Sequence, residues 1–259
     1  MGRGIDFVLI ITVVWGVAGC RTTPYEKPLP KKPAPSAQTT TVKAVRPADT
    51  EILAKATQQT LASVDGDGWR NLFDTKSLSG WKETDFAGHG EIYCTNGMMV
   101  MTMGDPFTGV NLTNEFPKMN YELALDAMRV SGSDFFCGVT MPVGESFCSL
   151  IVGGWGGSLL GISSLDSMDA SENETTRFVN FERGKWYRIR IRVTEGRIEG
   201  WLDKEKMVDV VTTDRKISVR PGDIELSKPF GICCWQTSSA LREIKVRSVT
   251  GAADPPKKH

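Results

Sequence analysis

The sequence predicts an all-β fold, a two-sheet antiparallel β-sandwich, and three observations support this prediction. Residues 185–203 alternate apolar and polar side chains on both sides of the turn signal Glu195-Gly196, as a β-hairpin with one apolar face does. A hairpin is not stable alone in water, so its apolar face needs a second layer. From Trp69 onward, short apolar runs alternate with turn signals such as Asn96-Gly97, and no long helical period competes with them.

The strands follow one another with short turns between them. They are expected at residues 71–73, 91–94, 98–103, 110–113, 121–130, 135–141, 147–153, 159–164, 186–193, 198–203, 208–212, 230–236 and 241–249. In the hairpin, alternate residues from Tyr187 onward point toward the core. Arg188, Arg190 and Arg192 point to the other face, with Glu199 opposite them. We interpret this arginine row as a solvated, charged sheet face, and the alternative is a site for a polyanion.

Before the sandwich, the first residues are typical of an export signal. Arg3 precedes an apolar run at residues 7–15 that is too short to span a bilayer. Residues 17–20, Val-Ala-Gly-Cys, resemble a bacterial lipobox, which implies a lipoprotein signal peptide at residues 1–19 and lipidation of Cys20. An ordinary signal peptide and an uncleaved anchor are the alternatives. We therefore expect an exported lipoprotein of the cell envelope, at the outer membrane because Arg21 replaces the acidic residue of an inner-membrane retention signal.

The composition of residues 20–259 predicts three further segments. Residues 20–63 are expected to form a disordered Pro- and Lys-rich tether that ends in a short helix or strap, residues 64–250 the sandwich, and residues 251–259 a polar tail. The chain has 31 basic and 31 acidic residues and lacks a basic stripe interleaved with aromatic residues, which argues against a nucleic-acid partner. A membrane, reached through lipidated Cys20, is the partner that the N-terminus indicates.

The cysteines leave two interpretations open. Cys137 and Cys148 flank a turn signal, and they face each other if the turn is centred between residues 142 and 143. A cross-strand disulfide is then geometrically feasible, and buried free thiols are the alternative. No Cys/His cluster has the spacing of a zinc site, so the sequence predicts no metal ligands, and the question of a divalent metal cofactor stays open.

Several segments together resemble the 3-keto-disaccharide hydrolase domain family. Residues 71–81, NLFDTKSLSGW, are similar to its opening motif, and further matches lie at residues 120–123, 201–203, 229–232 and 241–246. The middle of the chain is similar to that of a bacterial subgroup of the family. The lipobox-like residues 17–20 place this chain among lipoprotein members. The resemblance covers about residues 69–249 and implies a concanavalin A-like jelly roll.

The resemblance also implies chemistry on sugars that are oxidised at C3. A ketone there acidifies the C2 hydrogen, so a base can form an enolate and the C1 oxygen can leave by elimination, after which water adds to the ring. The arginine and the Glu or Gln that the family pattern carries near residues 132–137 and 147–153 have no counterpart here. A non-catalytic carbohydrate-binding or envelope-interaction sandwich is therefore the alternative to a 3-keto-glycoside hydrolase or lyase.

The candidate catalytic residues are three acids and a histidine. Asp166, Asp169 and Glu172 concentrate carboxylates in one loop, where they supply a base, bind Ca²⁺ or only solvate the loop. His89 lies inside the expected domain. Histidine ordinarily titrates near neutral pH, which suits proton abstraction, although a lone histidine is more often structural.

The candidate substrate-binding residues are Trp155, Phe86, Gln236 and Asp134. Trp155 lies among four glycines and presents an indole that either stacks on a sugar or plugs the end of the sandwich. Phe86 lies close to His89, and Gln236 matches a glutamine of the resembled family. Asp134 begins a strand, where its carboxylate binds a ligand or caps local amides. A carbohydrate is thus the expected ligand.

Overall fold

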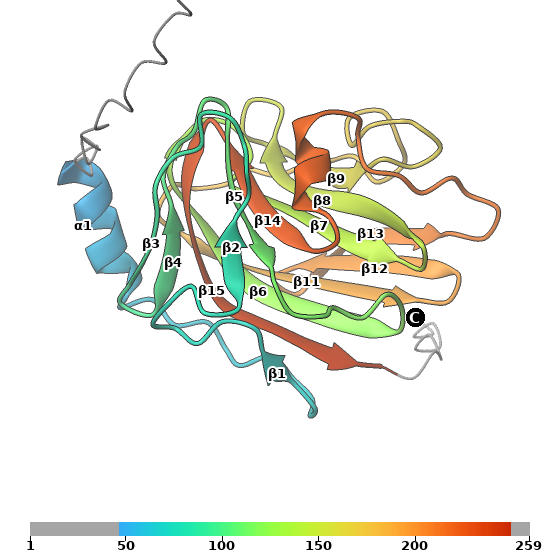
Figure 1. The fold of residues 1–259 in the computed structure, drawn as a ribbon, viewed down its shortest axis with the longest axis horizontal. Coiled ribbons are helices and arrows are strands. Elements are labelled where there is room, and N and C mark those ends of the chain that lie inside the picture. The colour runs from blue at the N-terminus through green and yellow to red at the C-terminus, as the bar shows by residue number, and fades with distance from the viewer. Residues whose placement is uncertain (1–46, 250–259) are drawn as a thin grey trace, which may run out of the picture. The chain divides into compact units, whose positions relative to one another are not determined.

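The computed structural model describes residues 47–249, which form two antiparallel sheets packed face to face (Figure 1). Sheet A has eight strands in the order β13-β12-β11-β6-β15-β4-β3, with β1 also paired to β15. Sheet B has seven strands in the order β10-β9-β8-β7-β14-β5-β2. The predicted all-β sandwich is confirmed. The expected signal peptide, Cys20 and the polar tail at residues 251–259 lie outside the described residues.

The elements have the following bounds. They are α1 (Pro47–Ala56), β1 (Arg70–Asn71), β2 (Trp81–Glu83), β3 (Ile92–Thr95), β4 (Met98–Met101), β5 (Phe107–Leu112), β6 (Tyr121–Gly132), β7 (Cys137–Val143), β8 (Ser146–Gly154), β9 (Leu159–Ser163), β10 (Arg177–Phe178), β11 (Trp186–Thr194), β12 (Arg197–Leu202), β13 (Glu205–Val211), the 3₁₀ helix η1 (Asp223–Ser227), β14 (Gly231–Trp235) and β15 (Thr237–Ser248). Every expected strand overlaps an observed one. The expectation missed β2 and β10, which have three and two residues and are too short to show an alternating pattern.

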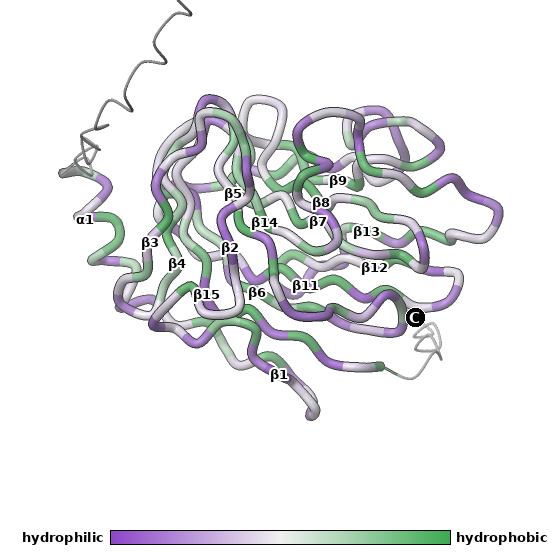
Figure 2. The backbone as a smooth tube through the Cα atoms, viewed as in Figure 1, coloured by the Kyte–Doolittle hydropathy of each residue, from purple (hydrophilic) through white to green (hydrophobic). Residues whose placement is uncertain are grey.

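The core lies between the two sheets, and the alternation of side chains decides which residues enter it. On β11, Tyr187 and Ile189 join the core, whereas Trp186 packs on the outer face of sheet A. On β8, Val152 joins the core and Ile151 packs on the outer face of sheet B. Figure 2 shows the hydrophobic stretches interleaved with hydrophilic ones along the chain. Each sheet therefore has an outer face that further segments cover.

Helix α1 and the segment that follows it cover part of the outer face of sheet A. Leu53 and Ala56 of α1 join the outer cluster around Trp186. The indole Nε1 of Trp186 donates to the carbonyl of Ala56 at 3.1 Å, and Arg188 Nη1 donates to the carbonyl of Ala62 at 2.9 Å. Within residues 47–249, no helix is long and apolar enough to cross a membrane.

The expected solvated arginine row is wrong, because the row pairs with buried acids. Glu122 on β6 is fully buried, 3.3 Å from Arg190 and 3.5 Å from Arg192. The register of β11 against β6 brings these opposite charges together. Glu199 faces Arg192 across the hairpin, as expected. A carboxylate removed from water needs such partners, so the row stabilises buried charge rather than facing solvent.

Of the two interpretations left open for Cys137 and Cys148, the structure agrees with buried free thiols. The turn between β7 and β8 falls at residues 144–145, later than expected, and its glycine has a φ of 65° that suits a tight hairpin turn. Cys148 therefore faces Met141, and Cys137 faces Val152. The five cysteines of the described residues are free thiols.

Candidate functional site

A cleft of about 460 Å³ opens on the outer face of sheet B. Its lining comes from four strands of that sheet, from the connection between β6 and β7, from the turn after β8 and from the segment that connects β13 to β14. These residues are Phe107, Asp134, Phe135, Ile151, Trp155, Ser163, Arg220, Pro221, Gly222, Asp223, Ile224 and Trp235. The connecting segment packs on the outer face of sheet B through Val219 and Ile224, so it forms one wall of the cleft.

Aromatic side chains form the floor of the cleft. Phe107 on β5 and Trp235 on β14 meet edge to face, with ring centroids 4.5 Å apart. Phe86 stacks on Phe107 at 4.7 Å but is buried, so it supports the floor from below instead of lining the cleft. The antiparallel register of β14 and β5 sets Trp235 opposite Phe107. Such a rigid aromatic surface suits a flat ligand with an apolar face.

Trp155 stands at the rim of the cleft in a conformation that packing alone does not explain. Its φ is 49°, in the left-handed region that bulky residues rarely adopt, and its side chain is 42% exposed. Residues 155–158 form the turn between β8 and β9. Residues held in such backbone conformations cluster at functional sites. The arrangement therefore favours a ligand platform over the plug that the sequence left open.

Asp134 lies on the same rim, and backbone amides hold its carboxylate. Its Oδ1 accepts from the N–H of Phe135 at 2.8 Å, and its Oδ2 accepts from the N–H of Gly156 at 3.1 Å. The hydroxyl of Thr237 accepts from the backbone N–H of Asp134 at 3.1 Å. Asp134 thus caps local amides, as one interpretation expected, and at the same time it lines the cleft beside Trp155.

Asp169 reaches the cleft through two residues that line it. Its Oδ1 accepts from the hydroxyl of Ser163 at 2.5 Å, and its Oδ2 is 2.5 Å from Nη1 of Arg220. The side chain of Arg220 is 59% exposed, whereas that of Asp169 is 15% exposed. Glu172 Oε2 accepts from the backbone N–H of Asp169 at 3.2 Å, so Glu172 supports this loop. A carboxylate and a cation thus lie side by side at the cleft.

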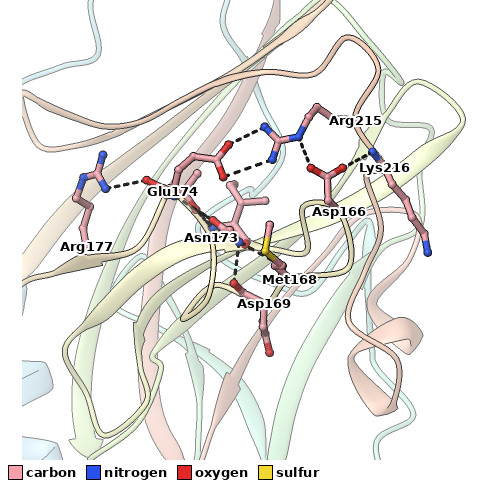
Figure 3. A network of polar contacts seen from close by, with 10 residues as sticks. Asp166, Met168, Asp169, Asn173, Glu174, Arg177, Arg215 and Lys216 are labelled. Atoms are coloured by element: carbon pink, nitrogen blue, oxygen red, sulfur yellow. Dashed lines mark hydrogen bonds and ion pairs between the residues drawn. The ribbon is translucent and has the colours of Figure 1, made fainter.

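Asp166 belongs to a different network, away from the cleft lining (Figure 3). Its carboxylate accepts from the backbone N–H of Lys216 at 2.8 Å and from Arg215, which also binds Glu174 at 2.7 Å. The pKa of Asp166 is lowered, chiefly by the Lys216 amide and then by Arg215. The pKa of Glu174 is lowered chiefly by its hydrogen bond with Arg215. Figure 3 shows both acids pointing toward Arg215.

His89 and Gln236 do not line the cleft. His89 is 39% exposed, and its Nδ1 lies 3.0 Å from the carbonyl of Gly90 and 3.7 Å from Glu83 Oε2. Gln236 follows β14 with an exposed side chain. Within residues 47–249, no group of His, Cys, Asp and Glu side chains is arranged to hold a metal ion.

The sequence did not identify the cleft residues Ser163, Arg220 and Trp235, nor Arg129 on β6, which contacts the turn of Trp155. Arg220 lies 51 residues from Asp169 in the chain, so no local motif joins the pair. The Pro221-Gly222 turn signal was visible, but a turn does not say which face of a sheet it crosses. Arg129 lies among apolar strand residues, and only its buried contacts reveal what it does.

Comparison with known proteins gives a family match and structural likenesses. The model of the 3-keto-alpha-glucoside-1,2-lyase-like domain matches residues 68–247. A candidate glycosyl hydrolase from Parabacteroides distasonis has 17% identity and a TM-score of 0.46 over 71% of this chain and 95% of its own. The carbohydrate-binding module CBM66 from Bacillus subtilis has 12% identity and a TM-score of 0.44 over 68% and 98%. Domain 4 of an extracellular arabinanase from Geobacillus stearothermophilus has 12% identity and a TM-score of 0.44 over 66% and 84%. No curated protein matches.

Proposed function

The chain belongs to the 3-keto-α-glucoside-1,2-lyase-like family of carbohydrate-active domains, and from this we propose that its cleft on sheet B binds a 3-keto-glycoside and cleaves the glycosidic bond. One observation carries the proposal above all. The exposed indole of Trp155 stands at the rim of a cleft that Arg220 and Ser163 also line, and both of these residues contact the carboxylate of Asp169. These are the groups that a sugar ring and its deprotonation require.

Binding uses the aromatic surfaces first. The C–H face of a pyranose ring packs on Trp155 or on the floor formed by Trp235 and Phe107, which buries apolar surface without desolvating the hydroxyl groups. Asp134 accepts from sugar hydroxyls at the rim, because a carboxylate has lone pairs beyond those that two backbone amides use. This arrangement fixes the orientation of the ring before any reaction occurs.

The reaction follows from the pair of Asp169 and Arg220. Arg220 moves its guanidinium to the C3 oxygen and stabilises the enolate, which leaves one oxygen of Asp169 without its cationic partner. That oxygen takes the C2 proton, and the electrons of the C2–H bond form the enolate. The enolate then expels the C1 oxygen, which takes a proton from water, and a C1–C2 double bond remains to which water adds. Ser163 keeps Asp169 in place through its hydroxyl hydrogen bond.

Incubation of the purified protein with a 3-keto-glucoside tests this proposal, with release of the aglycone as the readout. Asp169→Asn is expected to lower turnover by about 10²- to 10⁴-fold, the usual contribution of a general base. His89→Gln and Asp166→Asn test the other candidate bases and are expected to keep activity. Asp209→Asn, on β13 of the opposite sheet, is the matched control. Absence of turnover by the unmodified protein, with and without a divalent metal, contradicts the catalytic proposal.

A non-catalytic carbohydrate-binding domain is the second candidate. It is favoured by the full set of partners of Asp169, which accepts from Ser163, from the N–H of Ala170 at 2.7 Å and from Arg220. These hydrogen bonds occupy lone pairs of the carboxylate that proton abstraction would need. Calorimetric binding of a 3-keto-glucoside without turnover, lost in Trp155→Ala, would select this function. Co-purification of envelope proteins without sugar binding would instead indicate an envelope-interaction role.

We also propose export and anchoring through a lipid on Cys20. The support is the lipobox-like Val-Ala-Gly-Cys sequence after an apolar run of signal-peptide length. Growth of expressing bacteria with labelled palmitate is expected to label the membrane-bound protein, and Cys20→Ser is expected to abolish the label. An unlabelled wild-type protein contradicts the proposed anchoring.

A further inference from the structure

Arg129 is a buried cation that donates to four main-chain carbonyls of the described residues, three of them in the two segments that carry Asp134 and Trp155. It projects from β6 of sheet A into the end of the sandwich and is 8% exposed. Its Nη2 donates to the carbonyl of Gly157 at 2.7 Å and to those of Gly153 and Asp134 at 3.3 Å each. Its Nη1 donates to the carbonyl of Phe181 at 3.4 Å. The guanidinium therefore ties sheet A to the segment of Asp134 and to the turn of Trp155, two of the segments that line the cleft.

The glycines on either side of Trp155 are shaped around this guanidinium. A Cβ on Gly153 would lie 2.6 Å from Arg129 Nη2 and 2.9 Å from the Phe136 ring. A Cβ on Gly157 would lie 3.2 Å from Arg129 Nη1 and 2.9 Å from the carbonyl of Ser133. Both glycines also have positive φ, 82° and 104°. Because Gly153 and Gly157 have no side chain, the backbone on both sides of Trp155 packs closely against Arg129. This contact fixes the position of the loop that carries Trp155.

Burying a guanidinium is costly, and Arg129 is not optimally compensated. Its Nε has no hydrogen-bond partner within the part of the chain that the structure describes. Burial lowers its pKa, while the Asp134 carboxylate and Tyr187 act in the opposite direction. The guanidinium also lies over the Phe136 ring, with its carbon 5.2 Å from the centroid. An apolar side chain would fill this site at a lower desolvation cost. The contribution of the arginine is therefore its hydrogen bonds to the surrounding carbonyls.

We propose that Arg129 is the positioning residue of the cleft: through the carbonyls of Gly153, Gly157 and Asp134 it fixes Trp155 and the Asp134 carboxylate in one arrangement for a sugar ring. This inference rests on the proposed function for the identity of the ligand, but the arrangement itself exists without a ligand. Loss of the guanidinium releases the turn, after which Trp155 leaves its strained left-handed conformation. The amide of Gly156 then loses its hydrogen bond with Asp134.

Arg129→Lys keeps the charge and loses the forked donor, which makes it the principal variant. Without ligand, hydrogen exchange of the amides of residues 153–158 is expected to accelerate about tenfold or more, with a change in the emission of Trp155, identified by difference from Trp155→Phe. Affinity for a 3-keto-glucoside is expected to fall about tenfold. In the double variant Arg129→Lys, Trp155→Ala the losses of affinity are expected to add up to less than the sum of the two single losses, because part of the effect of Arg129 passes through Trp155 and only the part that passes through Asp134 remains.

Arg183→Lys is the matched control. Arg183 also donates to a main-chain carbonyl, that of Val130 at 2.6 Å, and none of its contacts reach the turn. If Arg129→Lys fails to fold, Gly157→Ala is used, because its Cβ pushes the turn off an intact Arg129. A lowered melting temperature with unchanged exchange and emission of the turn overturns the inference. If the wild-type protein binds no sugar, the proposed function fails, and the exchange and emission experiments still decide the role of Arg129.

Discussion

Two aspartates of one loop show how surroundings assign different roles to the same side chain. Asp166 and Asp169 are three positions apart, yet Asp166 pairs with Arg215 and Asp169 with Arg220 at the cleft. Arg215 and Arg220 both come from the segment that connects β13 to β14, so a single crossing supplies both cations. The cationic partner of Asp169 lines the cleft, and in the proposed reaction it leaves Asp169 for the ligand, whereas Arg215 and Lys216, the partners of Asp166, do not line the cleft. The surroundings of Asp169 therefore suit the proposed reaction, and those of Asp166 suit a structural role in the loop.

The Arg215 network should respond to acid. The folded pKa of Glu174 is lowered by Arg215, so the ionised form is favoured by folding. Its stabilising effect is therefore present above the unfolded pKa and disappears as the pH falls through the lowered folded pKa. In Arg215→Gln, carboxyl NMR titration should show the pKa of Glu174 returning toward 4.5. Asp166 should return only in part, because the Lys216 amide remains. Unchanged titration of Glu174 contradicts this account.

The reactivity of the five thiols of the described residues should depend on their burial. Burial raises the pKa of Cys148 and of Cys234 to about 12, and Cys137 and Cys233 are shifted in the same direction. At pH 8 iodoacetamide is expected to label the half-buried Cys94 first, and the other four only after unfolding, because the thiolate is the reactive form. Peptide mapping by mass spectrometry checks this. If the peptides of Cys137 and Cys148 stay unlabelled after unfolding and become labelled only when a reductant is added, these two residues form a disulfide.

At the scale of elements, the alternating pattern was enough to locate the long strands but not to set their neighbours. The apolar period of β11 identified its core face correctly, since that period depends only on the strand itself. Whether the arginines of β11 face solvent or pair with buried acids depends on β6, whose acidic residues lie far away in the sequence. The turn between β7 and β8 was misplaced because Pro142 and Gly144 are both turn formers, and only Gly144 takes a positive φ. Trp155 and Asp134 were predictable for the cleft, while Arg220 and Arg129 needed the packing of separate segments.

The buried pairing between β6 and β11 predicts a large effect for a small change. Glu122→Gln keeps the shape of a fully buried side chain and removes the charge that faces Arg190, Arg192 and Arg247. The free energy of unfolding should fall by about 3 to 5 kcal/mol, the usual cost of removing one partner of a buried pair. Urea denaturation measures it.

Glu145→Gln is the matched control for this change. Glu145 is 87% exposed and pairs with Lys118, so its loss should cost less than about 1 kcal/mol. Equal, small effects of the two substitutions would show that the arginines near Glu122 are not desolvated.

At the scale of the whole domain, the two sheets separate two tasks. The outer face of sheet A carries α1 and its following segment, packed on the cluster around Trp186. The outer face of sheet B carries the cleft. These faces lie on opposite sides of the core, so α1 packs on the side of the domain away from the cleft.

Truncation of the chain to residues 64–259 tests whether the faces are independent. Loss of α1 uncovers Met98, Met128 and Trp186, so stability should fall by about 2 to 4 kcal/mol and self-association should increase. A chain that begins at residue 47 keeps α1 and is the matched control. Calorimetry and sedimentation measure these changes, while sugar affinity and the emission of Trp155 should match those of the control. A parallel loss of sugar affinity at full folding would show that sheet A transmits the state of its outer face to the cleft, and Arg129, which spans from β6 to the turn of Trp155, would be the first connection to test.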